Sequence, residues 1–482
     1  MTHRYLYSIL AALLIAGSSA AQDSQTLQAL NERDIMGTAR YVGMSGAMTA
    51  VGGDPSAVAD NPAALGVYRH MEVGLTFDMQ IDRTWQVPGN NTLSSANRFT
   101  VNQASWVFTF GDDRYTEGLI YSNLMLSYRC IRSFNRGYYG SARNQTTSLT
   151  DVILNKTDGL HASALVPAGR WDDNEVGWLS ILGYDTWLIS PQETDSTAYT
   201  SVLSEGDLVN NELTVRESGN VNQYAIHWAG NINNRLFIGV GLNIQSLAYN
   251  RTATYRESFD GDWLKNASTV YMNGVGLNGS VGLIWHPVRL LRIGASFESP
   301  SINQLTVTNY GTMSSALKQG GAVNSYQLET PYYTGTQNNF VMPLRSSVGL
   351  AFQCKSLGLL SLQYDYTHWR NMDDVHTLKL GLEARYLGWY FNAGYAYEST
   401  FRRDEPIQEL AYNSVRTDTH FRNILATHYA SAGVGYRGHW CIAQLAYQFR
   451  WQAAHLYPHE LAEPYDITAN THRIVLTLAW HH

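Results

Sequence analysis

Apolar and polar residues alternate one by one in many segments between Met71 and the end of the chain. In MEVGLTFDMQ (71–80), every second residue is apolar and those between are polar or glycine. This period of two is that of a β-strand, whose successive side chains point to opposite faces. Four further segments repeat it: NRLFIGVGLNIQSLAY (234–249), LLSLQYDYTHW (359–369), LKLGLEARY (378–386) and CIAQLAYQFRW (441–451). The pattern predicts an all-β chain.

Such strands fit either a soluble sandwich or a transmembrane barrel. A barrel turns the apolar face to lipid and keeps polar residues in its lumen. Here one polar face carries Lys379, Glu383 and Arg385, and the apolar faces often end in Tyr or Trp. The chain has 31 Tyr and 13 Trp against 14 Phe, a bias typical of the aromatic belts at membrane interfaces. These features favour a transmembrane antiparallel β-barrel.

The N-terminus predicts a signal peptide, residues 1–21. Basic His3 and Arg4 precede the apolar run LYSILAALLIAG, and Ser19-Ala20-Ala21 offers a small-residue cleavage site. No later apolar run reaches the 18 or so residues of a transmembrane helix, so an exported chain would span the membrane with strands. The region 71–482 has room for about 14 strands with their turns and loops; because bacterial single-chain barrels have even strand numbers, about 12 or about 16 are the alternatives.

The longest gap in the alternation, about 135–211, predicts an extracellular loop. It contains TSLTDVILN (147–155) and EVGWLSILGYDTWLIS (175–190), whose spacing fits helical or interfacial segments. Long connections of this kind are usually functional or disordered. Two interpretations stay open: short helices that form an apolar landing patch, or a plain surface loop.

The segment before the first strand is unusually rich in small residues. Residues 37–66 contain seven Ala, six Gly and two Ser, and two prolines break them into short pieces. Small residues let one backbone approach another closely, as a segment inside a lumen must. We therefore expect residues 22–70 to form a plug (hatch) within the barrel 71–482. An N-terminal periplasmic arm is the alternative.

The stretch GTARYVGMSGAMTAVGGDPSAVADNPAALGVYRHMEVGLTF (37–77) resembles the hatch and first strand of the FadL/TodX family, which comprises outer-membrane transporters of hydrophobic compounds. LSYRCIRSFNR (126–136) and GVGLNGSVGLIWHPVRLLRIGASFESPS (274–301) resemble the branch of that family often labelled hemin receptors. The resemblance covers most of residues 35–480, and its most specific element is the Asn-Pro-Ala motif behind the small-residue run.

The resemblance implies a 14-stranded barrel, closed by a hatch that moves to pass hydrophobic molecules such as long-chain fatty acids. In this chain the gate residues would be Asn61, Pro62 and Ala63, with Gly52, Gly53 and Asp54 shaping the adjacent turn. Pure packing of the plug is the alternative role. Two departures from the family pattern are Ala64, where the branch often has glycine, and the strand near 119–134, which lacks a glycine to kink it for a lateral opening.

The sequence shows no catalytic set and no cofactor or metal site. GxSxG, HExxH and phosphate-loop motifs are absent, and the three cysteines form no disulfide framework or metal-ligand spacing. Fifteen scattered histidines have no paired spacing that fixes an iron. A net charge of −7 without a basic patch argues against nucleic acid.

We therefore expect a monomeric, non-enzymatic transporter in the outer membrane of a Gram-negative bacterium, whose partners are hydrophobic small molecules and outer-membrane lipid. A PorV-like interaction barrel that assists protein secretion is the alternative. A barrel enzyme acting on lipids would need catalytic residues that the sequence does not show.

Overall fold

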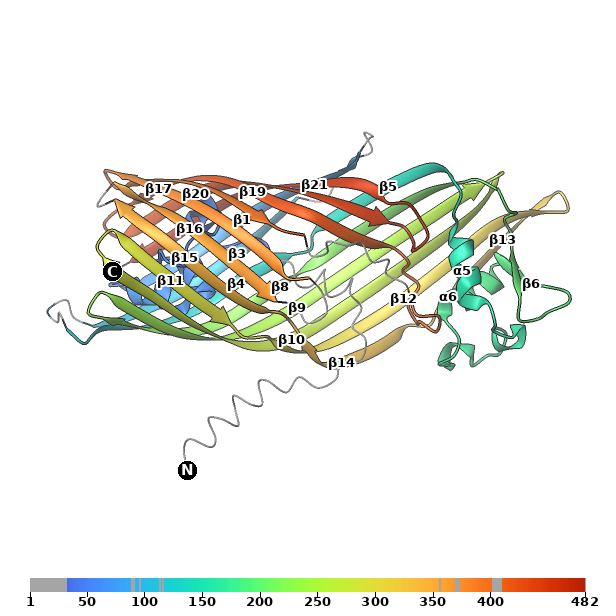
Figure 1. Cartoon of the computed structure of the whole chain (residues 1–482), viewed down its shortest axis with the longest axis horizontal. Coiled ribbons are helices and arrows are strands. Elements are labelled where there is room, and N and C mark those ends of the chain that lie inside the picture. Colours follow the sequence, from blue (N-terminus) through green and yellow to red (C-terminus); the bar gives the residue numbers. More distant parts are fainter. Residues whose placement is uncertain are drawn as a thin grey trace, which may run out of the picture.

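A computed structural model describes residues 33–87, 92–94, 97–111, 114, 117–354, 357–368, 373–400 and 410–481. Over these residues the chain forms a closed antiparallel barrel of 14 strands, as predicted (Figure 1). The first strand pairs with the last, from Glu72↔His481 to Gln86↔Ile467, which closes the cylinder. The predicted signal peptide lies outside the described residues.

Eleven of the barrel strands are single segments: β1 (Glu72–Gln86), β3 (Arg98–Gly111), β8 (Val209–Ile232), β9 (Leu236–Phe259), β10 (Asp262–Val288), β16 (Gly358–His368), β17 (Val375–Tyr386), β18 (Trp389–Glu398), β19 (Phe421–Arg437), β20 (Cys441–Tyr457) and β21 (Tyr465–His481). Three are broken into consecutive segments: β4 (Leu119–Ser133) with β5 (Arg136–Gln145), β11 (Leu291–Glu298) with β12 (Ile302–Gln319), and β13 (Ala322–Glu329) with β14 (Tyr333–Val341) and β15 (Leu344–Cys354). A short β2 (Thr92–Ser94) pairs with β1.

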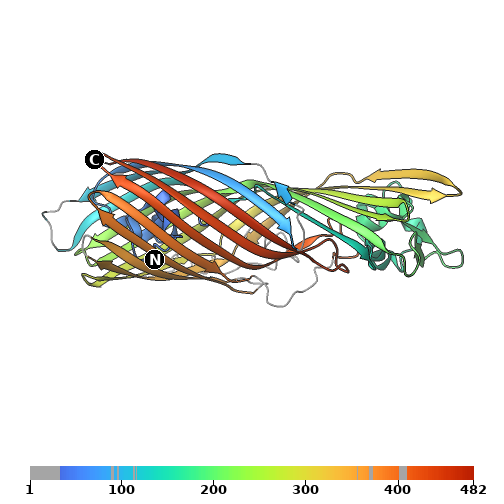
Figure 2. The ribbon, with the colours of Figure 1, turned by 90° about the horizontal axis from the view of Figure 1, so that it is seen from above.

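The barrel is much taller on one side than on the other (Figure 2). β8, β9 and β10 have 24, 24 and 27 residues, whereas β16, β17 and β18 have 11, 12 and 10. The long strands continue past the rest of the barrel, at the end opposite the one that carries the C-terminus (Figures 1 and 2). We call this part the outer extension; it includes the part of β9 beyond Leu247 and the structured part of the loop 135–211. We assign the C-terminal end to the periplasm, because bacterial barrels have short turns there and long extracellular segments.

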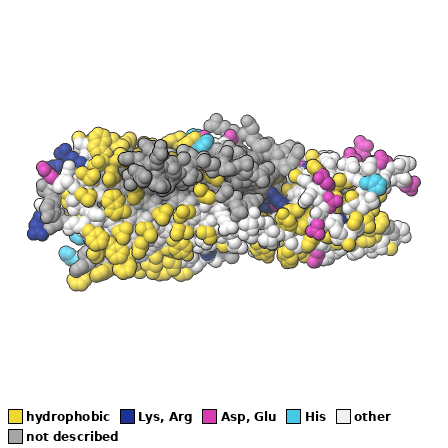
Figure 3. Space-filling view, turned by 90° about the horizontal axis from the view of Figure 1, so that it is seen from below, with side chains coloured by type: hydrophobic (Ala, Val, Ile, Leu, Met, Phe, Trp, Pro, Cys, Tyr) yellow, Lys and Arg dark blue, Asp and Glu magenta, His cyan; other side chains and the backbone are white. Residues whose placement is uncertain are grey.

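Within the barrel, the side-chain alternation is that of a membrane protein. On β9 the outward residues Val240, Leu242 and Ile244 are exposed, while the inward Asn243 and Gln245 are buried. A broad apolar surface covers the barrel half of the molecule (Figure 3). The predicted faces of this strand are therefore correct, and its apolar face meets lipid.

The alternation reverses in the outer extension. Beyond Leu247 on β9, the inward residues Ala253, Tyr255 and Phe259 are apolar and buried, whereas outward Arg256 is exposed. β8 changes in the same way, with Leu213 and Val215 buried. The outer extension thus has an apolar interior and a polar surface, which is the arrangement of a protein in water. The reversal marks the outer edge of the membrane-embedded wall.

The predicted loop 135–211 is largely structured. It begins with β5, which pairs with β8 from Arg136↔Glu217 to Gln145↔Val209. The loop then forms α5 (Leu149–Thr157), α6 (Trp178–Asp185), the 3₁₀ turns η2 (Ala162–Ala164) and η3 (Arg170–Asp172), and a small sheet of β6 (Ile189–Pro191) and β7 (Tyr199–Ser201).

The apolar side chains of these two helices join a core inside the outer extension; Leu149, Ile153, Ile181 and Leu182 are fully buried. The interpretation that the helices form an exposed apolar landing patch is therefore wrong. Ser148 caps α5, and the Glu257 carboxylate of β9 accepts hydrogen bonds from the Ser148 hydroxyl (2.5 Å) and the Leu149 amide (2.8 Å).

Residues 33–70 fold inside the C-terminal end of the barrel (Figure 1). They form α3 (Ala39–Gly43), α4 (Pro55–Asp60) and the 3₁₀ helix η1 (Pro62–Val67), and we call them the plug. Their buried side chains pack with inward residues of the wall in a core separate from that of the outer extension. Among the described residues, no helix has the length and apolarity needed to cross a bilayer.

Candidate functional site: the plug, its contacts and the wall beside it

The turn before α4 has the conformation that its sequence predicts. Gly52 and Gly53 have φ angles of +71° and +66°, which glycine adopts without strain. Asp54 then caps α4: its carboxylate accepts from the amides of Ser56 (2.8 Å) and Ala57 (3.4 Å) and from the Thr38 hydroxyl (2.7 Å). Burial raises the pKa of the Asp54 carboxyl above its usual range, while Arg40 opposes the shift.

The Asn-Pro-Ala motif lies against the barrel wall, next to this turn: the Gly53 amide donates to the Ala64 carbonyl (3.1 Å). The Asn61 side chain is fully buried; its amide donates to the carbonyls of Thr49 (2.8 Å) and Leu283 (3.3 Å), and its oxygen accepts from the Ala63 amide (3.1 Å). Asn61 therefore bonds the plug both to itself and to β10.

Glycines on the wall make this close approach possible. A Cβ at Gly239 of β9 would overlap the backbone of Pro62, and one at Gly282 of β10 would overlap Asn61 Oδ1. Two further wall glycines meet the plug backbone in the same way: Gly294 at Thr49 and Gly394 at Met44. The small residues that the sequence shows in the plug are thus matched by glycines on distant strands.

Buried ion pairs fix the plug as well. Arg40 Nε lies 2.5 Å from Glu383 Oε2 of β17, and Arg129 of β4 lies 3.1 Å from the Asp60 carboxylate. Removing one partner of a buried pair typically costs about 3–5 kcal/mol, because it leaves a buried charge uncompensated. The plug is held by polar bonds, by close backbone contacts and by buried apolar side chains such as Met44, Met48 and Leu65.

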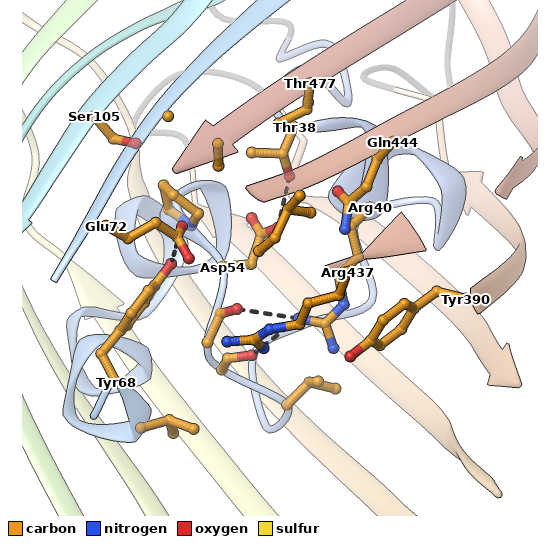
Figure 4. Close-up of a pocket in the computed structure, with 18 of the residues that line it drawn as sticks. Thr38, Arg40, Asp54, Tyr68, Glu72, Ser105, Tyr390, Arg437, Gln444 and Thr477 are labelled. Atoms are coloured by element: carbon orange, nitrogen blue, oxygen red, sulfur yellow. Dashed lines mark hydrogen bonds between the residues drawn. The ribbon is translucent and has the colours of Figure 1, made fainter. Parts of the chain in front are cut away.

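A cavity of about 340 Å³ lies between the plug and the periplasmic mouth (Figure 4). Gly52, Gly53 and Asp54 line it. Asn61, Pro62 and Ala63 do not belong to its lining, so three of the six predicted gate residues line this cavity and three do not. The remaining lining includes five arginines: Arg40, Arg69, Arg292, Arg385 and Arg437.

Above the plug, a charged layer crosses the lumen. A cavity of about 80 Å³ is lined by Arg33, Asp34, Arg345, Lys379 and Glu298, among others. A smaller cavity of about 20 Å³ adjoins it, and a second of about 20 Å³ adjoins the first. One has the guanidinium groups of Arg33, Arg132 and Arg345 in its lining, the other has aliphatic Leu247 and Leu305, and the two share Val221, Gln245 and Met342.

The barrel wall is interrupted beside this layer. β3 and β4 pair only from Gly111↔Tyr121 to Gln103↔Arg129, so residues 98–102 and 130–133 lie beyond the paired region. β4 ends at Ser133, and the chain resumes as β5 at Arg136. The plug contacts both sides of the interruption: Asn102 Nδ2 donates to the Gly37 carbonyl (3.1 Å), and the Ser133 amide donates to Asp34 (3.5 Å).

The sequence contained no glycine in 119–134 to predict this break. The glycine is instead on the neighbouring strand: Gly219 of β8 has φ +114°, and a Cβ there would overlap the Ala248 carbonyl of β9. The register between β4 and β8 shifts between Cys130 and Arg132, three residues before β4 ends. The sequence alone does not predict this break, because the glycine beside it belongs to β8, and only the strand pairing places that glycine next to the end of β4.

No family model matches the sequence, and no curated protein matches it. Solved structures do match its fold. A FadL homologue from Pseudomonas aeruginosa has a TM-score of 0.52 and 12% identity, covering 94% of this chain and 99% of its own. The toluene transporters TbuX of Ralstonia pickettii (TM-score 0.52, 15% identity) and TodX of Pseudomonas putida (0.50, 13%) each cover 93% of this chain and 99% of their own. These neighbours do not favour the PorV-like alternative.

Proposed function

We propose that this chain, which has the FadL/TodX fold, is a channel in the outer membrane of a Gram-negative bacterium that takes up hydrophobic molecules passively. The observation that carries the proposal is the interruption between β3 and β4, which lies beside the plug and within the lipid-facing wall. A hydrophobic molecule that reaches this point gains free energy by moving into the bilayer. Downhill partitioning needs no other energy source.

Movement of the plug is the gating step that we propose. Asp34 of the plug contacts one side of the interruption, and its carboxylate lies 3.6 Å from Arg450 and 4.0 Å from Arg132 and from Arg473. These distances exceed those of the tight ion pairs Arg40–Glu383 and Arg33–Glu298, both at 2.5 Å. We propose that movement of residues 33–37 begins at Asp34 and then breaks the Arg33–Glu298 pair, while Asn61 stays bonded to β10.

The substrate class that we propose is long-chain fatty acids and similar amphipathic acids. The support is the pair of small adjoining cavities, one lined by three guanidinium groups together with the Glu298 carboxylate and one by Leu247, Leu305 and Met342. A carboxylate is the chemical partner of a guanidinium, and an alkyl chain that of aliphatic side chains. Enlargement of these cavities when residues 33–37 move would accommodate a head group and a tail side by side.

Uptake by intact cells tests the proposal. Cells with and without the gene are given a labelled long-chain fatty acid and, in a parallel arm, labelled toluene. Faster uptake of the fatty acid alone in the cells with the gene supports the acid substrate. Equal uptake of both compounds with and without the gene would reject the channel, and selective toluene uptake would reject only the substrate class.

A reversible cross-link tests the movement of the plug. The hydroxyls of Ser45 in the plug and Ser431 in β19 lie 2.7 Å apart, close enough for a disulfide after Ser45→Cys and Ser431→Cys. Oxidation should abolish uptake and reduction should restore it, whereas Ser45→Cys alone should transport under both conditions. Unchanged uptake in the fully cross-linked protein would show that this part of the plug does not move.

A further inference from the structure

Three tyrosine–histidine pairs repeat along the outward face of the short-stranded side of the barrel. The tyrosine hydroxyl lies at hydrogen-bond distance from histidine Nδ1 in each pair, once per neighbouring strand pair: Tyr364–His376 (2.6 Å) on β16 and β17, Tyr395–His428 (2.8 Å) on β18 and β19, and Tyr447–His472 (2.7 Å) on β20 and β21. We call these six residues the Tyr–His belt. Its side chains are exposed or half-buried.

The belt lies at the outer edge of the lipid-facing surface. After His472, the next outward residues of β21 are Ile474, Leu476 and Leu478, and the exposed Trp480 follows eight positions from the histidine. On β19, exposed Tyr436 is likewise eight positions from His428. Eight residues of a strand tilted by about 40° rise about 20 Å, close to the height of a barrel's apolar band. The belt is therefore at the level of the outer-leaflet head groups.

The hydrogen bond within each pair determines what the imidazole offers to its surroundings. When the tyrosine hydroxyl donates to Nδ1, the proton of the neutral ring resides on Nε2. The ring is further held by aromatic contacts, as in the stacking of His428 on Trp451 at 5.0 Å. Each pair thus presents an oriented N–H donor at the membrane interface.

Carboxylates do not occupy these donors. Within the part of the chain that the structure describes, none of His376, His428 and His472 forms an ion pair with Asp or Glu, whereas nearby His368 contacts Asp374 (2.8 Å). The three imidazole N–H groups lie at one membrane level on consecutive strand pairs, so they can donate to hydrogen-bond acceptors that lie at the same level around the barrel. In a bilayer those acceptors are the phosphate oxygens of lipid head groups.

We propose that the Tyr–His belt binds phosphorylated head groups of lipids in the outer leaflet. Each Nε2–H donates to a phosphate oxygen, while the tyrosine ring contacts the acyl-chain side of the interface. This surface is separate from the lumen and the plug, so the proposal goes beyond transport. On this proposal, the shorter side of the barrel binds specific lipid head groups of the membrane around it.

Native mass spectrometry of the full-length refolded protein tests the belt. The probe is phosphatidic acid, which carries an exposed phosphate, and diacylglycerol with the same acyl chains is the comparison lipid. The triple variant His376→Phe/His428→Phe/His472→Phe keeps the aromatic rings and removes the donors. We expect it to retain about tenfold less phosphatidic acid than the wild type, with diacylglycerol retention unchanged.

Two further variants keep the test specific. His→Gln at the same three positions retains a side-chain N–H and should restore most of the binding. His161→Phe, at an exposed site in the outer extension, should leave binding unchanged. A resistance to heat denaturation equal to that of the wild type shows that each variant is folded.

Equal retention of phosphatidic acid by the folded triple Phe variant would overturn the proposal. Displacement of the lipid by an equal concentration of inorganic phosphate would also overturn it, because the site would then recognise free phosphate. Retention in the presence of that phosphate supports a head-group site.

Discussion

The barrel and the outer extension are built from the same strands, yet their interiors are opposite in character. On β9, inward Asn243 and Gln245 face the lumen at membrane level, and inward Tyr255 and Phe259 fill the core of the outer extension. The barrel interior has an apolar core as well, but it also holds the plug with buried ion pairs, hydrogen bonds to the wall and close backbone contacts. The outer extension holds α5 and α6 by apolar burial.

This difference suggests which part of the molecule can move. Hydrogen bonds and ion pairs inside a lumen can be exchanged for bonds to water, so the parts of the plug that polar bonds hold can rearrange at modest net cost. Apolar side chains such as Ile153 and Leu182 have no such alternative, and exposing them costs roughly 25 cal/mol per Å². We therefore expect the plug to be the mobile element and the outer extension to be a fixed one.

The largest expected effect comes from removing the plug. Deletion of residues 35–66 should leave a barrel that still resists heat denaturation, because β1–β21 pairing and the lipid-facing band are intact. The lumen should then conduct ions, which single-channel recording in planar bilayers would detect. A deleted protein that fails to assemble would show that the barrel depends on the plug for its structure.

A smaller opening is expected from a single wall substitution. Gly282→Val places a side chain where Asn61 Oδ1 lies and should displace η1, giving frequent brief conductance steps. Gly279→Ala on the same strand is the control, since a Cβ there meets only the Gly241 carbonyl at 3.7 Å. If Gly282→Val stays as closed as Gly279→Ala, the glycine contacts do not hold the plug.

In the outer extension, a buried charge should act on stability and not on conductance. Ile153→Asp introduces an unpaired carboxylate into the apolar core and should destabilise the helical cover by about 4 kcal/mol. Limited proteolysis of residues 146–208 would measure the loss, with Asn155→Asp on the exposed face of α5 as the control. An increase in conductance with Ile153→Asp would contradict the separation of the two regions.

Near neutral pH the smallest effect is that of the His459 imidazole, which grows only as the pH falls. His459, in the outer loop between β20 and β21, is fully buried, and burial lowers its pKa to about 3 from an ordinary value near 6.5. The unfolded state therefore binds the proton first, and stability should fall as the pH falls from 6.5 towards 3, by at most about 1.4 kcal/mol per unit. His459→Gln should flatten this dependence of the protease resistance of 146–208. An unchanged slope would assign it to another group.

The sequence predicted correctly those features that depend on the residues of a single strand. The alternation in 71–80 and 234–249 gave the correct faces, and chain length gave the strand count. The small-residue run before β1 also predicted a compact plug. Each of these inferences depends on residues that are neighbours in the chain.

The sequence did not predict the features that depend on which strands pair and in which register. Gly239 and Gly282 looked like ordinary polar-face residues until their strands were placed against Asn61 and Pro62. The reversal of faces on β9 is visible in NRTATYRESF (250–259), where the apolar residues stand at odd positions, whereas they stand at even positions earlier in the strand. Gly219 could not be linked to the β4–β5 break without the register between β4 and β8.

The pairing of β1 with β21 also has a consequence for assembly. The seam joins the first strand to the last, so the cylinder cannot shut until β21 has reached the growing sheet. The plug directly precedes β1, and strands on different parts of the cylinder, such as β10 and β17, bond to it. We therefore expect the plug to be in place before the seam forms. A plug that folds later would have to enter the closed barrel through its open end.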